Sequence, residues 1–435
     1  MMPHAKWLVC LFVALALPAS AARAELRTWD GKHAIDKIEV TVVYFVPQDR
    51  APLADWRRRV DYFCRRIERF HQRELDGQSQ LATKVYPEPF RSPRNSEQLR
   101  SGDADFIFFQ TLGEVDGQLH VGDGQRTAYP ILLVLSDINW RPLDDFYRLS
   151  KDKKGTQLEF DGQLHDGRHF PGSPSGGARA TYLADRGVGW GLVSADGWRV
   201  PYCGSDCVVY HEGVGHTVGL PHPQPGDGSV MSLGQYRGWL SESWLDEAQK
   251  TRLGWNRPKK MFDRAADLFS TFRALPEPAT PRPGEAVRLK VDWPVAAQVA
   301  ACRAWVQTDL GGPWVELAGK TGGDAPATLA LGSFDRPTPV SYRVEAELKG
   351  GQREELWGYF QIRAKPDQSP LPSMPPAELT SEPDRVAAIG EEVDLLPMVD
   401  VQRDGVSGDW TLGEGRLTSP KEFGARIELP YQPPE

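Results

Sequence analysis

The chain has 435 residues, which suggests about two to four domains at roughly 100–200 residues per domain. Apolar residues make up 40% and charged residues 25% of it, as in an ordinary soluble globular protein. The net charge of −8 and the lack of a concentrated basic segment disfavour nucleic acid as a partner.

Residues 1–24 are typical of a signal peptide. Lys6 gives a positive start, and the apolar run from Trp7 to Leu17 is too short to span a bilayer. Ala22-Arg23-Ala24 fits a small-residue cleavage site, and Ala19-Ser20-Ala21 fits equally well. No other segment is apolar enough to cross a membrane. The sequence therefore predicts an exported protein, secreted, periplasmic or at the cell surface, with no membrane span.

The first half of the chain alternates predicted strands and helices. A β-branched strand at residues 37–46 precedes a helix between 52 and 75, whose apolar residues recur at three- and four-residue steps. Further strands are expected at 81–86, 104–109 and 131–135, with a short helix at 143–150 and, after a polar loop, a hairpin at 188–200 that turns at Asp196-Gly197. This alternation predicts a mixed α/β layer.

Two pairs of side chains suggest further sites. Because export exposes a protein to oxidising conditions, Cys203 and Cys207 are expected to form a disulfide, with a second metal site as the alternative. His165 and His169 lie four residues apart in the polar loop at 159–177, where a solvated loop is the simpler interpretation and a secondary metal site the alternative.

A dense group of metal-binding residues follows. His211, Glu212, His216 and His222 fall in one short segment. Three neutral imidazoles form a catalytic zinc site that leaves the fourth position to water. The metal lowers the pKa of that water from about 15.7 toward 7, so that a neighbouring carboxylate can take its proton. We therefore predict Zn²⁺ held by the three histidines, with Glu212 as general base.

The segment from His216 to His222 resembles the zinc peptidases called metzincins, whose pattern contains H-x-x-G-x-x-H followed by a methionine turn. Ser229-Val230-Met231-Ser232 is similar to that turn, which implies that Met231 lies beneath the metal without binding it. The resemblance also implies a protein or peptide substrate. It further implies a substrate-binding edge strand, here the 188–200 hairpin, and a helix after the turn, here 241–253.

The first half of the motif departs from the metzincin pattern, because His211 and His216 are five residues apart instead of four. On a regular α-helix a five-residue step rotates the side chain by roughly 140°, too far to share a metal. A local π-turn at Gly213 to Gly215 would take up the extra residue. The spelling H-E-x-x-G-H is similar to the zinc motif of the dipeptidyl peptidase III family. The alternative ligand set is Glu212, His216 and His222, which leaves no base.

The expected fold class is α+β, with a metzincin-like catalytic domain of mixed sheet and active-site helix at residues 25–272. A proline-rich linker follows at 276–283. Short strands with turns between them predict an immunoglobulin- or fibronectin-like β-sandwich at 284–364. A second linker at 365–378 leads to a partial β module at 379–435, which is short for a complete module. Either the chain is truncated or this piece packs on its neighbour.

The sequence thus predicts an exported zinc-dependent endopeptidase. One alternative is an adhesion or binding protein that retains the metal but cleaves weakly or not at all, because the motif carries an extra residue. Another is a zinc hydrolase of a different kind. The C-terminal β modules are expected to contact carbohydrate or protein.

Overall fold

The computed structural model describes residues 25–429 apart from 125, 140–146, 152–157, 165–177, 225, 233, 235–237, 261, 309, 311, 336–337, 365–393, 414, 422–424 and 428. The expected signal peptide and the pair His165 and His169 lie outside these residues. Within them, no helix combines the length and hydrophobicity needed to cross a membrane.

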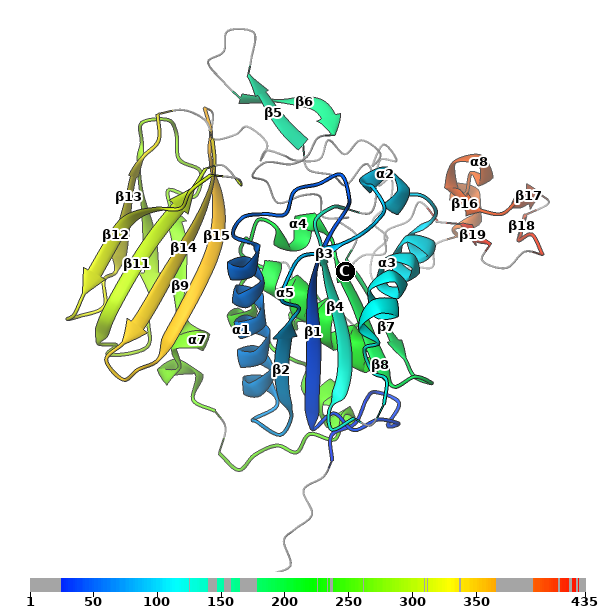
Figure 1. Cartoon of the computed structure of the whole chain (residues 1–435), viewed down its shortest axis with the longest axis horizontal. Helices are drawn as coiled ribbons and strands as arrows, with labels where there is room; N and C mark the ends of the chain where they lie inside the picture. Colours follow the sequence, from blue (N-terminus) through cyan, green and yellow to red (C-terminus); the bar gives the residue numbers. More distant parts are fainter. Residues whose placement is uncertain are drawn as a thin grey trace, which may run out of the picture.

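A mixed sheet forms the centre of the N-terminal part (Figure 1). Its strands are β1 (Lys37–Val46), β2 (Gln80–Val85), β3 (Phe90–Arg91), β4 (Tyr129–Ser136), β7 (Arg179–Leu183) and β8 (Val188–Val193). The order is β2-β1-β4-β8-β7, with β3 paired to the end of β1. All neighbours run parallel except β7, which is antiparallel to β8 at the edge.

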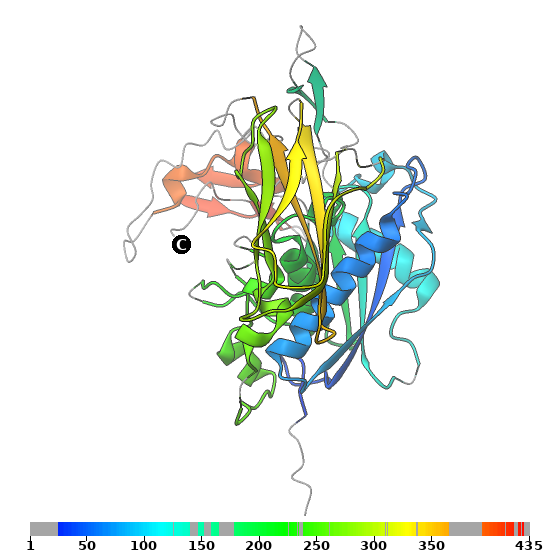
Figure 2. The same cartoon turned by 90° about the vertical axis from the view of Figure 1, so that its left-hand side faces the viewer.

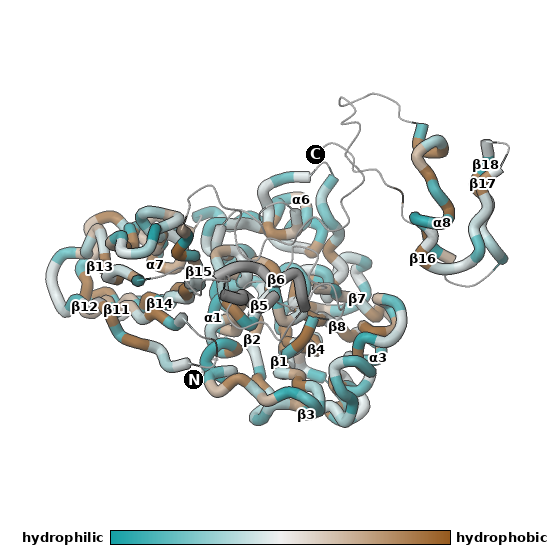
Figure 3. The backbone as a smooth tube through the Cα atoms, turned by 90° about the horizontal axis from the view of Figure 1, so that it is seen from above, coloured by the Kyte–Doolittle hydropathy of each residue, from teal (hydrophilic) through white to brown (hydrophobic). Residues whose placement is uncertain are grey.

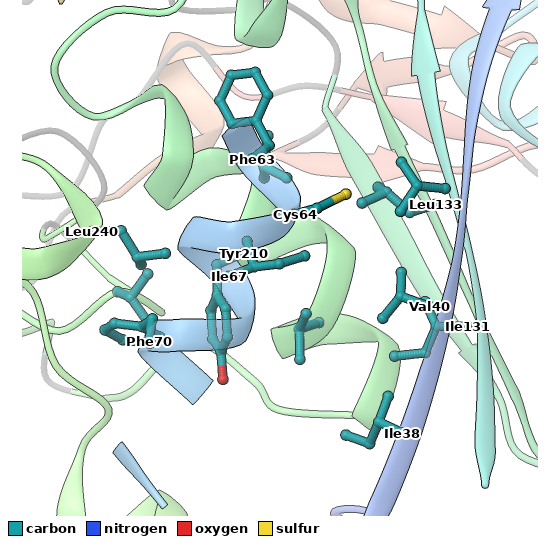
Figure 4. Close-up of a cluster of buried hydrophobic side chains, with 14 of the residues drawn as sticks. Ile38, Val40, Phe63, Cys64, Ile67, Phe70, Ile131, Leu133, Tyr210 and Leu240 are labelled. Atoms are coloured by element: carbon teal, nitrogen blue, oxygen red, sulfur yellow. The ribbon is translucent and has the colours of Figure 1, made fainter. Parts of the chain in front are cut away.

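Helices cover both faces of this sheet. The α-helices of the N-terminal part are α1 (Trp56–Glu74), α2 (Ser96–Leu99), α3 (Ala104–Leu119), α4 (Ala195–Trp198), α5 (Ser205–Tyr210), α6 (Glu247–Arg252) and α7 (Leu268–Thr271). On one face, alternate β1 residues such as Val40 pack with Ile67 of α1 and Tyr210 of α5 (Figure 4). On the other, Phe45 packs with Phe108 of α3. Strands covered on both sides are nearly continuous apolar runs, as β4 is. Figure 3, seen from above, shows apolar (brown) parts of the tube around β1 and β4.

Two antiparallel sheets follow, beside α1 (Figures 1 and 2). One has the order β13-β10-β9 and the other β12-β11-β14-β15. Their strands are β9 (Arg273–Glu277), β10 (Ala286–Asp292), β11 (Val299–Gln307), β12 (Val315–Thr321), β13 (Thr328–Ser333), β14 (Thr338–Leu348) and β15 (Arg353–Ile362). Apolar residues of both sheets form a common core. We call this part the sandwich. Since β9 pairs with β10, the sandwich begins at Arg273, before the first residue of the linker expected at 276–283.

The sandwich and the N-terminal part each bury one tryptophan in the core of the other. Trp239 is fully buried in the sandwich core, while Trp357 of β15 is fully buried in the core beside α1. The Trp239 Nε1–H donates a hydrogen bond of 2.9 Å to the Trp357 carbonyl. Beyond the sandwich, the described elements are a 3₁₀ turn (Leu396–Met398), α8 (Val401–Asp404), β16 (Gly405–Ser407), β17 (Thr411–Gly413), β18 (Arg416–Thr418) and β19 (Arg426–Ile427). The mixed sheet with helices, followed by antiparallel sheets, is consistent with the α+β class.

Four local predictions are wrong. The expected strand at 104–109 is the start of α3, because the Asp103 side chain accepts a hydrogen bond from the Phe106 N–H and caps a helix. The expected hairpin at 188–200 is β8 followed by α4, which begins after Ser194, so that Asp196-Gly197 lies in a helical turn.

The other two corrections concern short helices. The expected helix at 241–253 begins at Glu247, because the Asp246 side chain accepts from the Gln249 N–H. The end of the expected helix at 143–150 is strand β5 (Tyr147–Lys151), which pairs with β6 (Leu158–Leu164). The start of that expected helix lies outside the described residues.

Candidate metal centre and active site

The helix that carries the histidines changes its winding at the motif. α5 ends at Tyr210, a π-helix covers His211–Gly215, and a 3₁₀ turn covers His216–Val218. The His216 N–H donates to the His211 carbonyl, five residues earlier. This wider turn takes up the extra residue of the motif, and the predicted π-turn is confirmed.

The π-turn brings the three imidazoles together. The Nε2 atom of His211 lies 2.9 Å from that of His216 and 3.1 Å from that of His222, and the last two are 3.2 Å apart. In a tetrahedral zinc site with bonds of 2.0–2.1 Å, ligand nitrogens lie about 3.3 Å from one another. The three nitrogens therefore have nearly the spacing of a three-histidine zinc site. Among the described residues this is the group identified as able to hold a metal ion, and it does not include Glu212.

Hydrogen bonds on the far side of two rings determine their tautomers. His211 Nδ1 lies 2.8 Å from the Val230 carbonyl, and His216 Nδ1 lies 2.7 Å from the Leu220 carbonyl. A carbonyl only accepts, so each Nδ1 carries the proton and each Nε2 presents a lone pair. Lone pairs that face each other at about 3 Å repel unless a cation lies between them. These donor groups therefore fit a metal ion.

Burial keeps the two inner imidazoles neutral. It lowers the pKa of His211 to about 3, with the other two histidines adding to the effect, and it also lowers the pKa of His216. His222 is exposed and reaches the group because the chain reverses at Gly219, whose φ of 86° lies in the left-handed region that favours glycine. Neutral imidazole is the form that binds metal.

The predicted methionine turn supports this arrangement from behind. Met231 is fully buried and its sulfur packs directly against Gly215, at a place where a side chain on that residue would have to lie. The preceding residue, Val230, provides the carbonyl that orients His211. The turn thus touches the histidine segment twice, once through a side chain and once through the backbone. Met231 is not a member of the metal-binding group.

Two glycines of β8 let the histidine segment lie directly on the sheet. A Cβ on Gly191 would meet the Glu212 carbonyl oxygen at 2.6 Å, and one on Gly189 would collide with Thr217. Both distances are shorter than van der Waals contact. The sheet therefore holds the motif through backbone contact, with no intervening side chains.

Glu212 follows the first histidine and is partly buried. Burial raises the pKa of its carboxyl group to about 8, and the positive charge of Arg179 on β7 acts in the opposite direction. Arg179 itself pairs with Asp105 of α3. Glu212 is thus a partly buried carboxyl group that directly follows His211 in the chain and interacts electrostatically with Arg179 of the edge strand β7.

Buried arginines of α1 hold the surrounding elements in place. Arg66 donates to the Asp206 carboxylate at 2.9 Å and to the Ser241 hydroxyl at 2.9 Å, and both Arg66 and Asp206 are almost completely buried. Asp206 in turn accepts from the Leu240 N–H at 3.0 Å. This network joins α1, the start of α5 and the segment after the methionine turn.

These supporting arginines were not predicted from the sequence. Arg59, Arg66 and Arg73 recur every seven residues on α1 and are all buried. That seven-residue spacing was the signal in the sequence from which they could have been predicted.

Cys203 and Cys207 were expected to form a disulfide, but both thiols are free, and the Cys207 thiol is 3.4 Å from the Gly238 carbonyl.

No protein-family model matches the sequence, and no curated protein matches it either. A crystal structure of catalytically inactive OgpA from Akkermansia muciniphila, in complex with an O-glycopeptide (glycodrosocin) substrate, is similar to this chain at 13% sequence identity. The match covers 81% of this chain and 97% of that one, with a TM-score of 0.27. A TM-score this low establishes neither a shared fold nor a shared activity.

Proposed function

We propose that this chain is an exported zinc-dependent endopeptidase related to the metzincins. The observation that carries the proposal is the convergence of the Nε2 atoms of His211, His216 and His222, two of them held unprotonated by hydrogen bonds to carbonyl groups. When bound there, a zinc ion would polarise a substrate carbonyl and make water more acidic. Export is proposed from the character of residues 1–24.

The residues around the histidines have separate roles in this proposal. Glu212 accepts a proton from the attacking water and delivers it to the leaving amine. The substrate backbone adds as an extended strand to the edge of the sheet. That edge is β7 and not the 188–200 segment, because β8 is covered by β7 on its outer side. The arrangement supports a peptide substrate, since a strand edge recognises main-chain groups.

The π-helix bears on the binding-only alternative. That alternative was motivated by the extra residue between His211 and His216, which a regular helix could not accommodate. The π-turn removes this geometric objection. We therefore favour catalysis over metal-dependent adhesion.

The test compares two variants of the mature protein on a broad set of peptides. Glu212→Gln should retain zinc and lose about 10²–10⁴-fold in kcat, because it removes the general base and no metal ligand. His216→Ala should lose both zinc and cleavage, and a chelator should abolish cleavage by the wild type. If Glu212→Gln loses its zinc instead, the alternative ligand set is correct. If it cleaves at the wild-type rate, Glu212 is not the base.

A further inference from the structure

The outer edge of β7 is the natural place for a bound peptide under the proposed function, on which this inference rests. Within the described part of the chain this edge pairs with no strand. The Glu212 backbone lies against Gly191, whose ladder partner on β7 is Ala180. A peptide added to β7 therefore passes the metal centre at the level of Ala180.

The pleat of the sheet determines where the side chains of such a peptide lie. Arg179 and Thr181 pair with Leu192 and Trp190, which belong to the core beneath α3. Side chains alternate between faces along a strand and match across neighbouring strands. Every second side chain of the peptide would therefore lie on the α3 face. Those beside Arg179 and Thr181 are within about two residues of the bond cleaved at the level of Ala180.

α3 presents an exposed aromatic ring on this side. The ring of Phe109 is 44% exposed, and its centroid lies 6.3 Å from that of Trp190. Four residues before Phe109, Asp105 pairs with Arg179, and seven residues after it Asp116 accepts from Arg186 at 2.8 Å. Arg179 begins β7 and Arg186 follows its end. These two ion pairs orient this side of α3, with Phe109 between them, toward the open edge.

We propose that Phe109, supported by Trp190, forms an apolar subsite that selects a large aromatic or aliphatic side chain within two residues of the cleaved bond. The exposed ring of Phe109 offers apolar surface that a substrate side chain would bury. The ion pairs on either side of it hold α3 against β7. An aromatic pair is stabilised both by the apolar area that it buries and by the electrostatic attraction between the two rings, and alanine loses both contributions. The corresponding preference for phenylalanine over alanine is roughly tenfold in kcat/KM.

Phe106 is a matched control on the same helix. It is the same residue type and is more exposed, at 54%. Its ring packs over Gly102, where a Cβ would meet Phe106 Cδ1 at 2.6 Å, and it makes no aromatic contact with β8 in the described structure. Replacing it removes a similar apolar side chain from α3, three residues from Phe109, and leaves in place the ring that contacts Trp190.

The experiment uses the full zinc-loaded chain and a peptide that it cleaves, with phenylalanine or alanine placed in turn at each of the three positions on either side of the cleaved bond. One position should show the roughly tenfold preference for phenylalanine. Phe109→Ala should remove that preference, Phe109→Leu should retain part of it, and Phe106→Ala should leave it unchanged. The proposal is overturned if Phe109→Ala keeps the preference, or if Phe109→Ala and Phe106→Ala lower it equally.

A binding measurement separates this proposal from the proposed function. Fluorescence anisotropy with the Glu212→Gln chain should show weaker binding of the phenylalanine peptide, by roughly tenfold, when Phe109→Ala is added. Binding of the alanine peptide should not change. If the wild-type chain cleaves no peptide, the proposed function fails, whereas this difference in binding still supports the subsite. Equal binding of both peptides by chains with and without Phe109 overturns the subsite itself.

Discussion

Replacing Gly191 by alanine should displace the histidine segment from the sheet. The new Cβ would lie 2.6 Å from the Glu212 carbonyl oxygen, whereas heavy atoms in contact lie at about 3.5 Å. The strand and the π-helix must therefore separate by about 0.9 Å at this point. Because the obstructing atom belongs to the backbone, no side-chain rotation can relieve the contact.

The separation should reduce both stability and metal affinity. Overpacking of this kind costs about 1–3 kcal/mol, and in a protein of this size each kcal/mol lowers Tm by about 2–4 °C. Glu212 is bonded directly to His211, so a shift of its backbone carries that ligand with it. Zinc sites tolerate errors of only about 0.2 Å in ligand distance, and we expect the Kd for zinc to rise by about 10–100-fold.

Competition with a chromophoric chelator measures the Kd, and thermal unfolding of the metal-free chain measures the stability change separately. Gly113→Ala is the control. Gly113 lies within α3, and a Cβ there would meet no atom within 4 Å. That substitution should stabilise the helix by roughly 0.5–1 kcal/mol and leave the Kd unchanged. An unchanged Kd and Tm for Gly191→Ala would refute the close contact between β8 and the metal centre.

Two further predictions concern buried polar groups of α1. Burial lowers the pKa of His71 to about 3, so below about pH 6.5 the unfolded chain binds a proton that the folded chain does not, and stability falls as pH falls. Between pH 7 and pH 5, the free energy of unfolding measured with urea should fall by about 2 kcal/mol less for His71→Gln than for the wild type. Equal decreases in the two proteins would contradict this. Arg66→Met leaves Asp206 buried without its cation and should cost about 3–5 kcal/mol. Adding Asp206→Asn should recover part of that loss, and full additivity would show that the pair is not coupled.

Local features of the motif were predictable from the sequence. The three histidines lie in one short segment, so their spacing alone restricts the backbone conformations that can bring them together. The five-residue step excluded a regular helix, and Gly213 and Gly215 marked where it widens. A regular helix would favour Glu212 as a ligand together with His216 and His222, whereas the wider turn brings His211 to them instead.

Interactions between distant residues were not predictable in the same way. The Arg66–Asp206 pair joins residues 140 positions apart, and the Val230 carbonyl reaches His211 across 19 positions. The apolar run at 104–109 is compatible with a strand or with a buried helix, and Asp103 decides between them by capping α3. The helix expected at 241–253 failed because its first residues pack as a 3₁₀ turn at Leu240–Glu242.

The most direct test of the three-histidine metal centre is X-ray absorption spectroscopy of the purified mature chain, combined with metal analysis. We expect about one zinc per chain, with three imidazole nitrogens at about 2.0–2.1 Å and no sulfur ligand. His216→Ala should lose most of that zinc. A sulfur ligand, a carboxylate in place of one of the imidazoles, or full retention of zinc by His216→Ala would contradict a site made by His211, His216 and His222.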